Sequence, residues 1–166
     1  MPRIFLRSAI VCLTSSIFFQ DAAQSQQREF TEEELSAAKS VVEHFGNVFL
    51  HDGGEELSEI TIPSEAIGRM IVREKPSVEV AKIHQQIIEG NLLRFKEWRA
   101  MFADLSKLTV QGFEPGYLLK ADYLADDARV MHNAYAVLGY ANRIIIKLKI
   151  EDLFFYGGKW YIVKLD

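Results

Sequence analysis

The chain has little cysteine, and that shortage limits both its chemistry and the way its fold can be stabilised. Its one cysteine among 166 residues, Cys12, lies in an apolar segment near the N-terminus. The residues that follow that segment therefore have no disulfide bonds and no thiol chemistry. Their core has to be stabilised by packing alone.

Clustered positive charge is also missing. The formal net charge is −4, and no stretch of the chain gathers lysine and arginine into a basic run. A surface that binds a phosphate backbone needs such a basic stripe. We therefore expect no nucleic-acid partner.

Long hydrophobic runs are lacking as well. The mostly apolar run from Ser8 to Phe19 is twelve residues long, and a membrane span needs about 20. Arg3 and Arg7 precede it, and residues 23–25 (Ala-Gln-Ser) follow with small residues where a signal peptidase cuts. This order predicts a cleaved secretory signal over residues 1–25.

Cleavage after Ser25 would leave residues 26–166 with a formal charge of −5, because two basic residues and one acidic residue are removed. We expect one exported domain, periplasmic or secreted, that is not attached to a membrane. Two alternatives are an uncleaved anchor and a lipid anchor on Cys12. Ile10 and Val11, which precede that cysteine, are larger than lipoprotein processing usually accepts.

Helical patterns occupy the first half of this domain. Thr31 and Glu34 form a capping box, and Asp52 with its two following glycines marks the end of the helix. Apolar residues at three- and four-residue spacing give the helix one buried stripe. The stripe consists of Leu35, Ala38, Val42, Phe45 and Phe49.

Two more helices are expected, and the segment 55–63 between the first two is ambiguous. Ser64 is a candidate cap for a short helix that ends at Met70, and Ser77 is a candidate cap for a long helix over 78–105. The alternative to an unbroken long helix is a kink or break at Gly90, because glycine costs about 1 kcal/mol against alanine inside a helix.

Strand patterns replace helical ones from Leu108 onward. We expect strands over 108–113, 117–124 and 128–138, and then a hairpin over 143–166 that turns at Gly157-Gly158. Helices followed by strands indicate an α+β fold with N-terminal helices packed on one face of a curved antiparallel sheet. We find no repeat or linker, so the domain is single.

The final hairpin has two different faces. A two-residue loop places Tyr156 opposite Lys159 and Glu151 opposite Lys164, a favourable charge pair. One face carries an apolar set that could form an exposed patch and an interface with a second copy or another protein. That set is Leu153, Phe155, Trp160 and Ile162. A different register, or an N-terminal segment that covers the patch, is the alternative.

The opposite face holds the candidate chemistry. It carries apolar residues from Ile144 to Tyr156 with Asp152 as its only anion, so we expect it to face the core. Pairing Leu138 with Ile144 places His132 diagonal to Asp152, and a slip of one residue would separate them. An imidazole beside a carboxylate suits proton transfer. The alternative is a hydrogen-bonded core histidine, or a bulge that turns Asp152 outward.

With the capped helix, the further helices and the terminal Gly157-Gly158-Lys159-Trp160 hairpin, the chain resembles the nuclear transport factor two-like superfamily. The resemblance implies helices against a bent sheet that encloses a conical pocket. Members include isomerases, dehydratases, cyclases and non-catalytic binding domains, so the fold does not decide the function. Isomerase-type members use an acidic base and a tyrosine. Asp122, Tyr123 and Tyr135 supply those residue types without a motif, and Tyr123 is a pocket candidate.

Metal and cofactor motifs are missing from the sequence. None of the four histidines has a paired ligand spacing such as His-Glu-x-x-His, and no glycine-rich phosphate loop occurs. We therefore expect no metal and no cofactor; a zinc site would have to assemble from distant segments.

These patterns favour a small exported binding module that holds an apolar or amphipathic ligand or docks a partner. The alternative function is a pocket enzyme that transfers protons, of the isomerase or dehydratase type, with His132 and Asp152 as the working pair. A third possibility is an assembly factor that keeps residues 1–25 as an anchor.

Overall fold

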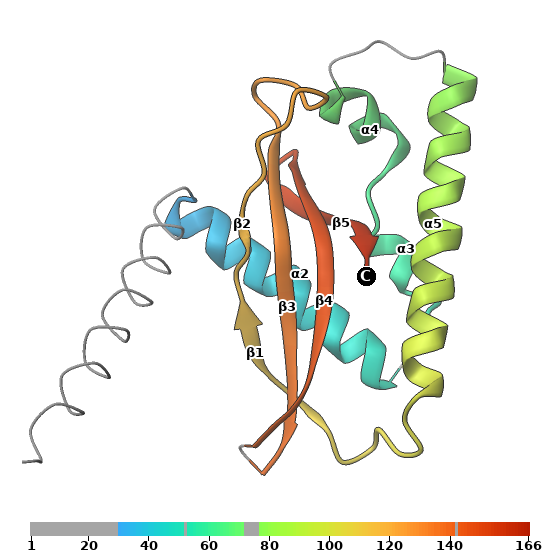
Figure 1. Ribbon diagram of the computed structural model, residues 1–166, viewed down its shortest axis with the longest axis vertical. Coiled ribbons are helices and arrows are strands. Elements are labelled where there is room, and N and C mark those ends of the chain that lie inside the picture. The colour runs from blue at the N-terminus through green and yellow to red at the C-terminus, as the bar shows by residue number, and fades with distance from the viewer. Residues whose placement is uncertain (1–29, 52, 72–76, 142) are drawn as a thin grey trace, which may run out of the picture.

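The chain folds into helices packed against an antiparallel sheet, which confirms the α+β prediction (Figure 1). The computed structural model describes residues 30–51, 53–71, 77–141 and 143–166. The predicted signal segment, 1–25, lies outside the described residues. The helices are α2 (Glu32–His51), α3 (Leu57–Ile60), α4 (Ser64–Met70) and α5 (Ser77–Ala100). Among these, none combines the length and apolarity required to cross a membrane.

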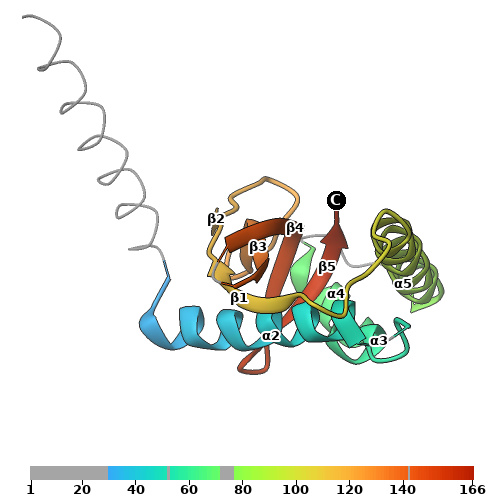
Figure 2. The same cartoon turned by 90° about the horizontal axis from the view of Figure 1, so that it is seen from below.

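The strands form one sheet in the order β1-β3-β4-β5, and the short β2 pairs with β3 beyond the end of β1. Their bounds are β1 (Thr109–Glu114), β2 (Tyr117–Leu118), β3 (Arg129–Tyr140), β4 (Arg143–Tyr156) and β5 (Lys159–Leu165). Helix α2 crosses one face of the sheet, and α5 stands beside the edge strand β5 (Figure 2).

Helix α2 begins as the sequence predicts. The backbone N–H of Thr31 donates to Glu34 Oε2 at 2.8 Å, and the backbone N–H of Glu34 donates to Thr31 Oγ1 at 3.1 Å, so the capping box is confirmed. Of the predicted stripe, Leu35 is partly buried and the other members are buried in the main core. Capping and periodicity were therefore enough to place this helix.

The later helices differ from the prediction at their ends. The segment 78–105 is helical only to Ala100, because Met101 and Phe102 donate to carbonyls three residues back and tighten the last turn. The helix is continuous through Gly90. Ser64 is the first residue of α4 and not its cap, since Pro63 occupies the cap position.

The predicted strands also change length. The expected strand over 117–124 shrinks to Tyr117–Leu118, and β3 continues to Tyr140, beyond its expected end. The connection to β4 is correspondingly shorter than predicted, and Ala141 in it has a φ of 48°.

The register between β3 and β4 is two residues away from the prediction. Leu138 pairs with Ile146 instead of Ile144, which places His132 directly opposite Asp152 instead of diagonal to it. A two-residue shift leaves every side chain on its expected face, because strand faces alternate with a period of two. The predicted pair of His132 and Asp152 therefore survives the error.

The final hairpin keeps its predicted register near the turn. Gly157 and Gly158 have φ values of 59° and 82°, as a two-residue loop of this kind requires, and Tyr156 pairs with Lys159. Further from the turn, β4 is irregular around Asp152, so Asp152 replaces Glu151 as the backbone partner of Lys164.

This irregularity changes which side chains of β4 point to each face of the sheet. Ile150 and Leu153, three residues apart, both belong to the main core with α2, whereas Phe154 packs in a second cluster with Ile67 of α4. The predicted continuous core face from Ile144 to Tyr156 is therefore wrong: a bulge shifts the alternation by one residue.

The predicted exposed patch is also wrong, and the alternative, in which an N-terminal segment covers this face, is confirmed. Leu153, Trp160 and Ile162 are buried in the main core, and Phe155 is partly buried against it. Helix α2 and the residue before its cap cover this face, since Phe30 packs edge-on against Trp160 and the Trp160 indole N–H donates to the Glu34 carbonyl at 2.8 Å. A homodimer or other protein partner stays a prediction.

Candidate functional site

A polar row crosses four strands at the middle of the sheet. In the ladder, Tyr117 of β2 pairs with His132 of β3, His132 pairs with Asp152 of β4, and Asp152 pairs with Lys164 of β5. Directly paired residues have neighbouring side chains on the same face. The strand register therefore assembles the row, which we call the polar row.

The closest contact in the polar row joins His132 and Asp152. Nδ1 of His132 lies 2.7 Å from Oδ1 of Asp152, and about a fifth of each side chain is exposed. That separation is a hydrogen-bond distance, with the imidazole Nδ1–H as donor and the carboxylate oxygen as acceptor. The Tyr117 ring packs edge-on against the imidazole with centroids 5.2 Å apart.

A second carboxylate joins the row from the neighbouring position on β4. Successive residues of a regular strand point to opposite faces, but β4 is irregular on both sides of Asp152. Ligand atoms of His132, Glu151 and Asp152 consequently lie within 4.8 Å of one another. One imidazole and two carboxylates, from β3 and β4, therefore lie close together in the polar row.

Lys164 balances this negative charge. Its Nζ lies 2.6 Å from Oε2 of Glu151. The hydrogen bond to Glu151 raises the pKa of Lys164, and the charges of Glu151 and Asp152 add to the effect. The lysine is therefore a permanent cation beside the two carboxylates at neutral pH.

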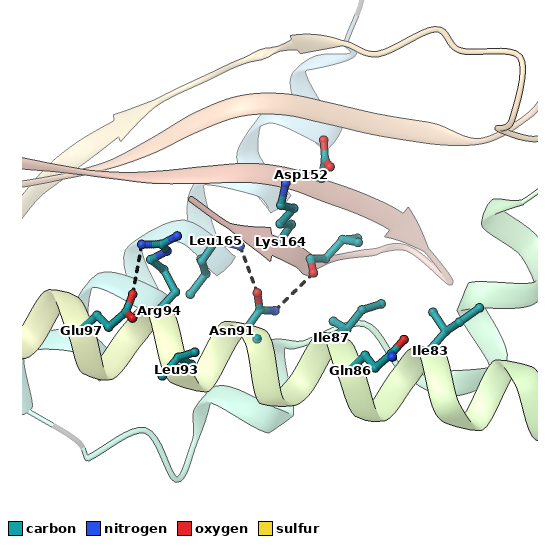
Figure 3. A pocket seen from close by; sticks show the side chains of 12 residues that line it. Ile83, Gln86, Ile87, Asn91, Leu93, Arg94, Glu97, Asp152, Lys164 and Leu165 are labelled. Atoms are coloured by element: carbon teal, nitrogen blue, oxygen red, sulfur yellow. Dashed lines mark hydrogen bonds and ion pairs between the residues drawn. The ribbon is translucent and has the colours of Figure 1, made fainter.

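A hollow of about 490 Å³ adjoins the polar row between α5 and β5 (Figure 3). Asp152 and Lys164 lie on its sheet side, and α5 forms the opposite wall. Its apolar lining consists of Ile83, Ile87, Leu93, Val163 and Leu165. Arg94 and Glu97, which form an ion pair at 3.1 Å, also line it.

Asn91 fixes the distance between the two walls of the hollow. This buried side chain accepts a hydrogen bond from the backbone N–H of Leu165 at 3.0 Å and donates to the carbonyl of Val163 at 3.3 Å. The amide therefore pairs with the edge of β5 as a further strand would, and the hollow extends along α5 beside it (Figure 3).

The sequence located part of this site. His132 and Asp152 lie together as predicted, and the predicted ion pair of Glu151 and Lys164 is present. Tyr123 is 61% exposed after β2 and does not line the hollow. Tyr117 lies beside the histidine instead, which could not be predicted because the pairing of β2 with β3 has no local sequence signal.

No family model, no curated protein and no solved structure matches this chain. The geometry of the polar row and the hollow therefore carries the functional argument.

Proposed function

We propose that this protein is an exported binding module that holds a small amphipathic ligand in the hollow between α5 and β5. The observation that carries the proposal is the hollow itself, about 490 Å³ with five aliphatic residues in its lining. Ligand sites are commonly concavities of about 300–1,000 Å³ with apolar walls and a few placed polar groups. The hollow has both features, and we take it as this chain's counterpart of the conical pocket that the family resemblance implies.

The charged residues around the hollow indicate the chemistry of the ligand. Lys164 and Arg94 supply cations, and each also has an acidic partner nearby, Glu151 and Glu97 respectively. An anionic head group could replace either acidic partner while its hydrocarbon part contacts Ile87 and Val163. The lining carries two cations, Arg94 and Lys164, and two carboxylates, Glu97 and Asp152. We therefore favour an aliphatic or aromatic acid, bound at one of the cations, over an uncharged sugar.

Gly90 offers a direct test of this proposal. It lies on the helical wall of the hollow, and a Cβ built there meets no atom within 4 Å. Gly90→Leu should therefore fill the hollow without disturbing the fold. We expect it to weaken binding of the fluorescent probe anilinonaphthalene sulfonate by about tenfold or more, since a loss of roughly 1.4 kcal/mol in affinity has that effect.

Gly68→Leu is the matched control. Gly68 is also helical, also has open space around a built Cβ, and lies on α4 away from this hollow. The control should bind the probe as the natural protein does. Equal affinity in both variants, or no saturable binding in the natural protein, would contradict the proposed site.

A second candidate function is proton transfer by His132 and Asp152, favoured by their 2.7 Å contact beside the hollow. An imidazole oriented by a carboxylate is a common general base. A nitrobenzisoxazole, whose ring opens after removal of one proton, reports such a base without a known substrate. We expect ring opening above the buffer rate, reduced about 100-fold by His132→Gln, the lower end of typical general-base contributions.

The control for this assay is His84→Gln, on α5 but absent from the lining of the hollow. If the natural protein and both variants open the ring at the same rate, the site is not a base and the binding function stands alone.

A further inference from the structure

We propose that His132, Glu151 and Asp152 form a binding site for a divalent transition-metal ion, with zinc as its representative. This inference goes beyond the proposed ligand binding and does not depend on the hollow. The donor atoms are one imidazole nitrogen and two carboxylate oxygens, all within 4.8 Å of one another. Mixed nitrogen and oxygen donors of this kind suit zinc and its neighbours better than calcium or magnesium, which prefer oxygen alone.

The distances allow a single ion to contact all three groups. Zinc binds imidazole nitrogen and carboxylate oxygen at about 2.0–2.2 Å, so ligand atoms around it lie about 3–3.5 Å apart. Nδ1 of His132 and Oδ1 of Asp152 are already 2.7 Å apart, and the three side chains are partly exposed. An ion bound at Nδ1 displaces the hydrogen bond to Asp152 and leaves the ring proton on Nε2. Small rotations of these side chains would bring the set to coordinating distance.

The backbone supports a site at this place. Glu151 and Asp152 are adjacent on β4, and a regular strand would point them to opposite faces. The register shifts on both sides of Asp152 bring both carboxylates near the same imidazole. On the neighbouring strand β3, Asn133 has a φ of 61° and no paired residue in β4, whereas His132 before it and Ala134 after it both pair with β4. Bulges that re-aim side chains are common beside functional sites.

Charge also favours a dication. Two carboxylates face one imidazole, and Lys164 neutralises Glu151 with its Nζ at 2.6 Å from Oε2. The lysine side chain is 58% exposed, so its ammonium group can move into solvent when an ion arrives. Lys164 is therefore a competitor of the metal and not a ligand. Substitution of the lysine and substitution of any of the three donors should therefore change the metal affinity in opposite directions.

The experiment titrates zinc chloride into the purified, tag-free full-length protein in a calorimeter, with cobalt absorption as a second readout of the ligand set. We expect one equivalent of zinc to bind. His132→Gln, Glu151→Gln and Asp152→Asn should each weaken zinc affinity by about tenfold or more, since even supporting residues of metal sites contribute about 10–100-fold. Lys164→Met should tighten it, because the competing cation is gone.

The control pair is His44 and Glu56, an exposed imidazole and carboxylate 3.9 Å apart that offer the same donor types elsewhere. His44→Gln should leave zinc affinity and the cobalt spectrum unchanged. Circular dichroism of each variant reports whether it is folded.

Absence of zinc binding in the natural protein overturns the proposal, as does binding that survives all three donor substitutions or weakens in Lys164→Met. None of these results depends on Gly90→Leu, so the metal site and the ligand hollow can fail separately.

Discussion

Glu34 shows how one residue can connect a local signal to the tertiary fold. Its carboxylate completes the capping box with Thr31 and also accepts two hydrogen bonds from Arg129 of β3, at 2.9 Å and 2.8 Å. Its carbonyl accepts the indole N–H of Trp160. A paired Arg–carboxylate contact of this kind is stronger and more directional than a single neutral hydrogen bond. The start of α2 is thereby fixed to both β3 and β5.

The pH dependence of stability should reveal this role. Burial opposes ionisation of Glu34, but hydrogen bonds from Arg129 and Thr31 outweigh it and lower its pKa from the ordinary 4.5. A carboxyl with a lowered pKa in the folded state stabilises the fold above its unfolded pKa and loses that contribution as the pH falls through the folded pKa. Glu34→Gln should therefore reduce the free energy of unfolding at neutral pH by about 2 kcal/mol and flatten its fall in acid.

Urea unfolding at a series of pH values from neutral to acidic measures this effect. Glu33→Gln is the control, because Glu33 lies in the same helical turn and is exposed. If the two variants have the same stability at every pH, the contact of Glu34 with Arg129 does not stabilise the fold.

At the scale of the elements, local signals located the helices and the final hairpin turn well and the pairing of the other strands poorly. The capping box, the α2 stripe and the glycine hairpin depend on residues close in sequence, so they could be predicted. The register of β3 and β4 depends on where the chain turns. The pattern predicted that the turn begins at Gly139, but β3 continues to Tyr140 before the chain turns. The error was two residues, so the faces were preserved and the contact of His132 with Asp152 was anticipated.

The sequence left a bulge at Asp152 open as an alternative but could not show that one is present. Alternation predicts a constant face along β4, but the strand is irregular around Asp152, and this brings Glu151 to the polar row. The same alternation predicted an exposed Trp160 face, whereas Phe30 and α2 cover it. Which helix packs on which face of the sheet is decided by tertiary packing. The position of α5 beside β5 therefore could not be deduced from the periodicity of α5 alone. The hollow was missed for that reason.

At the scale of the whole molecule, the two sides of the sheet are packed differently. The main core joins α2 to residues of β3, β4 and β5, and it includes Phe95 and Trp98 from the C-terminal half of α5. The N-terminal half of α5 contributes partly buried residues, among them Ile83 and Ile87, to the second cluster. Asn91 lies between these halves and is hydrogen-bonded to the edge strand β5. Covered edge strands are protected from pairing with other chains.

Asn91 should therefore determine how firmly α5 is attached to the rest of the fold. Asn91→Ala would leave the Leu165 N–H and the Val163 carbonyl without their amide partner, and a buried group left unsatisfied costs about 1–3 kcal/mol. We expect a loss of roughly 2 kcal/mol in denaturant unfolding, within that range. Native-state hydrogen exchange should accelerate most in β5 and α5, and amides of α2 and β3 should change only by the global loss. Gln86→Ala is the control, because Gln86 lines the same hollow from an exposed position on α5. A uniform increase in exchange across all elements would show that α5 opens only when the whole molecule unfolds.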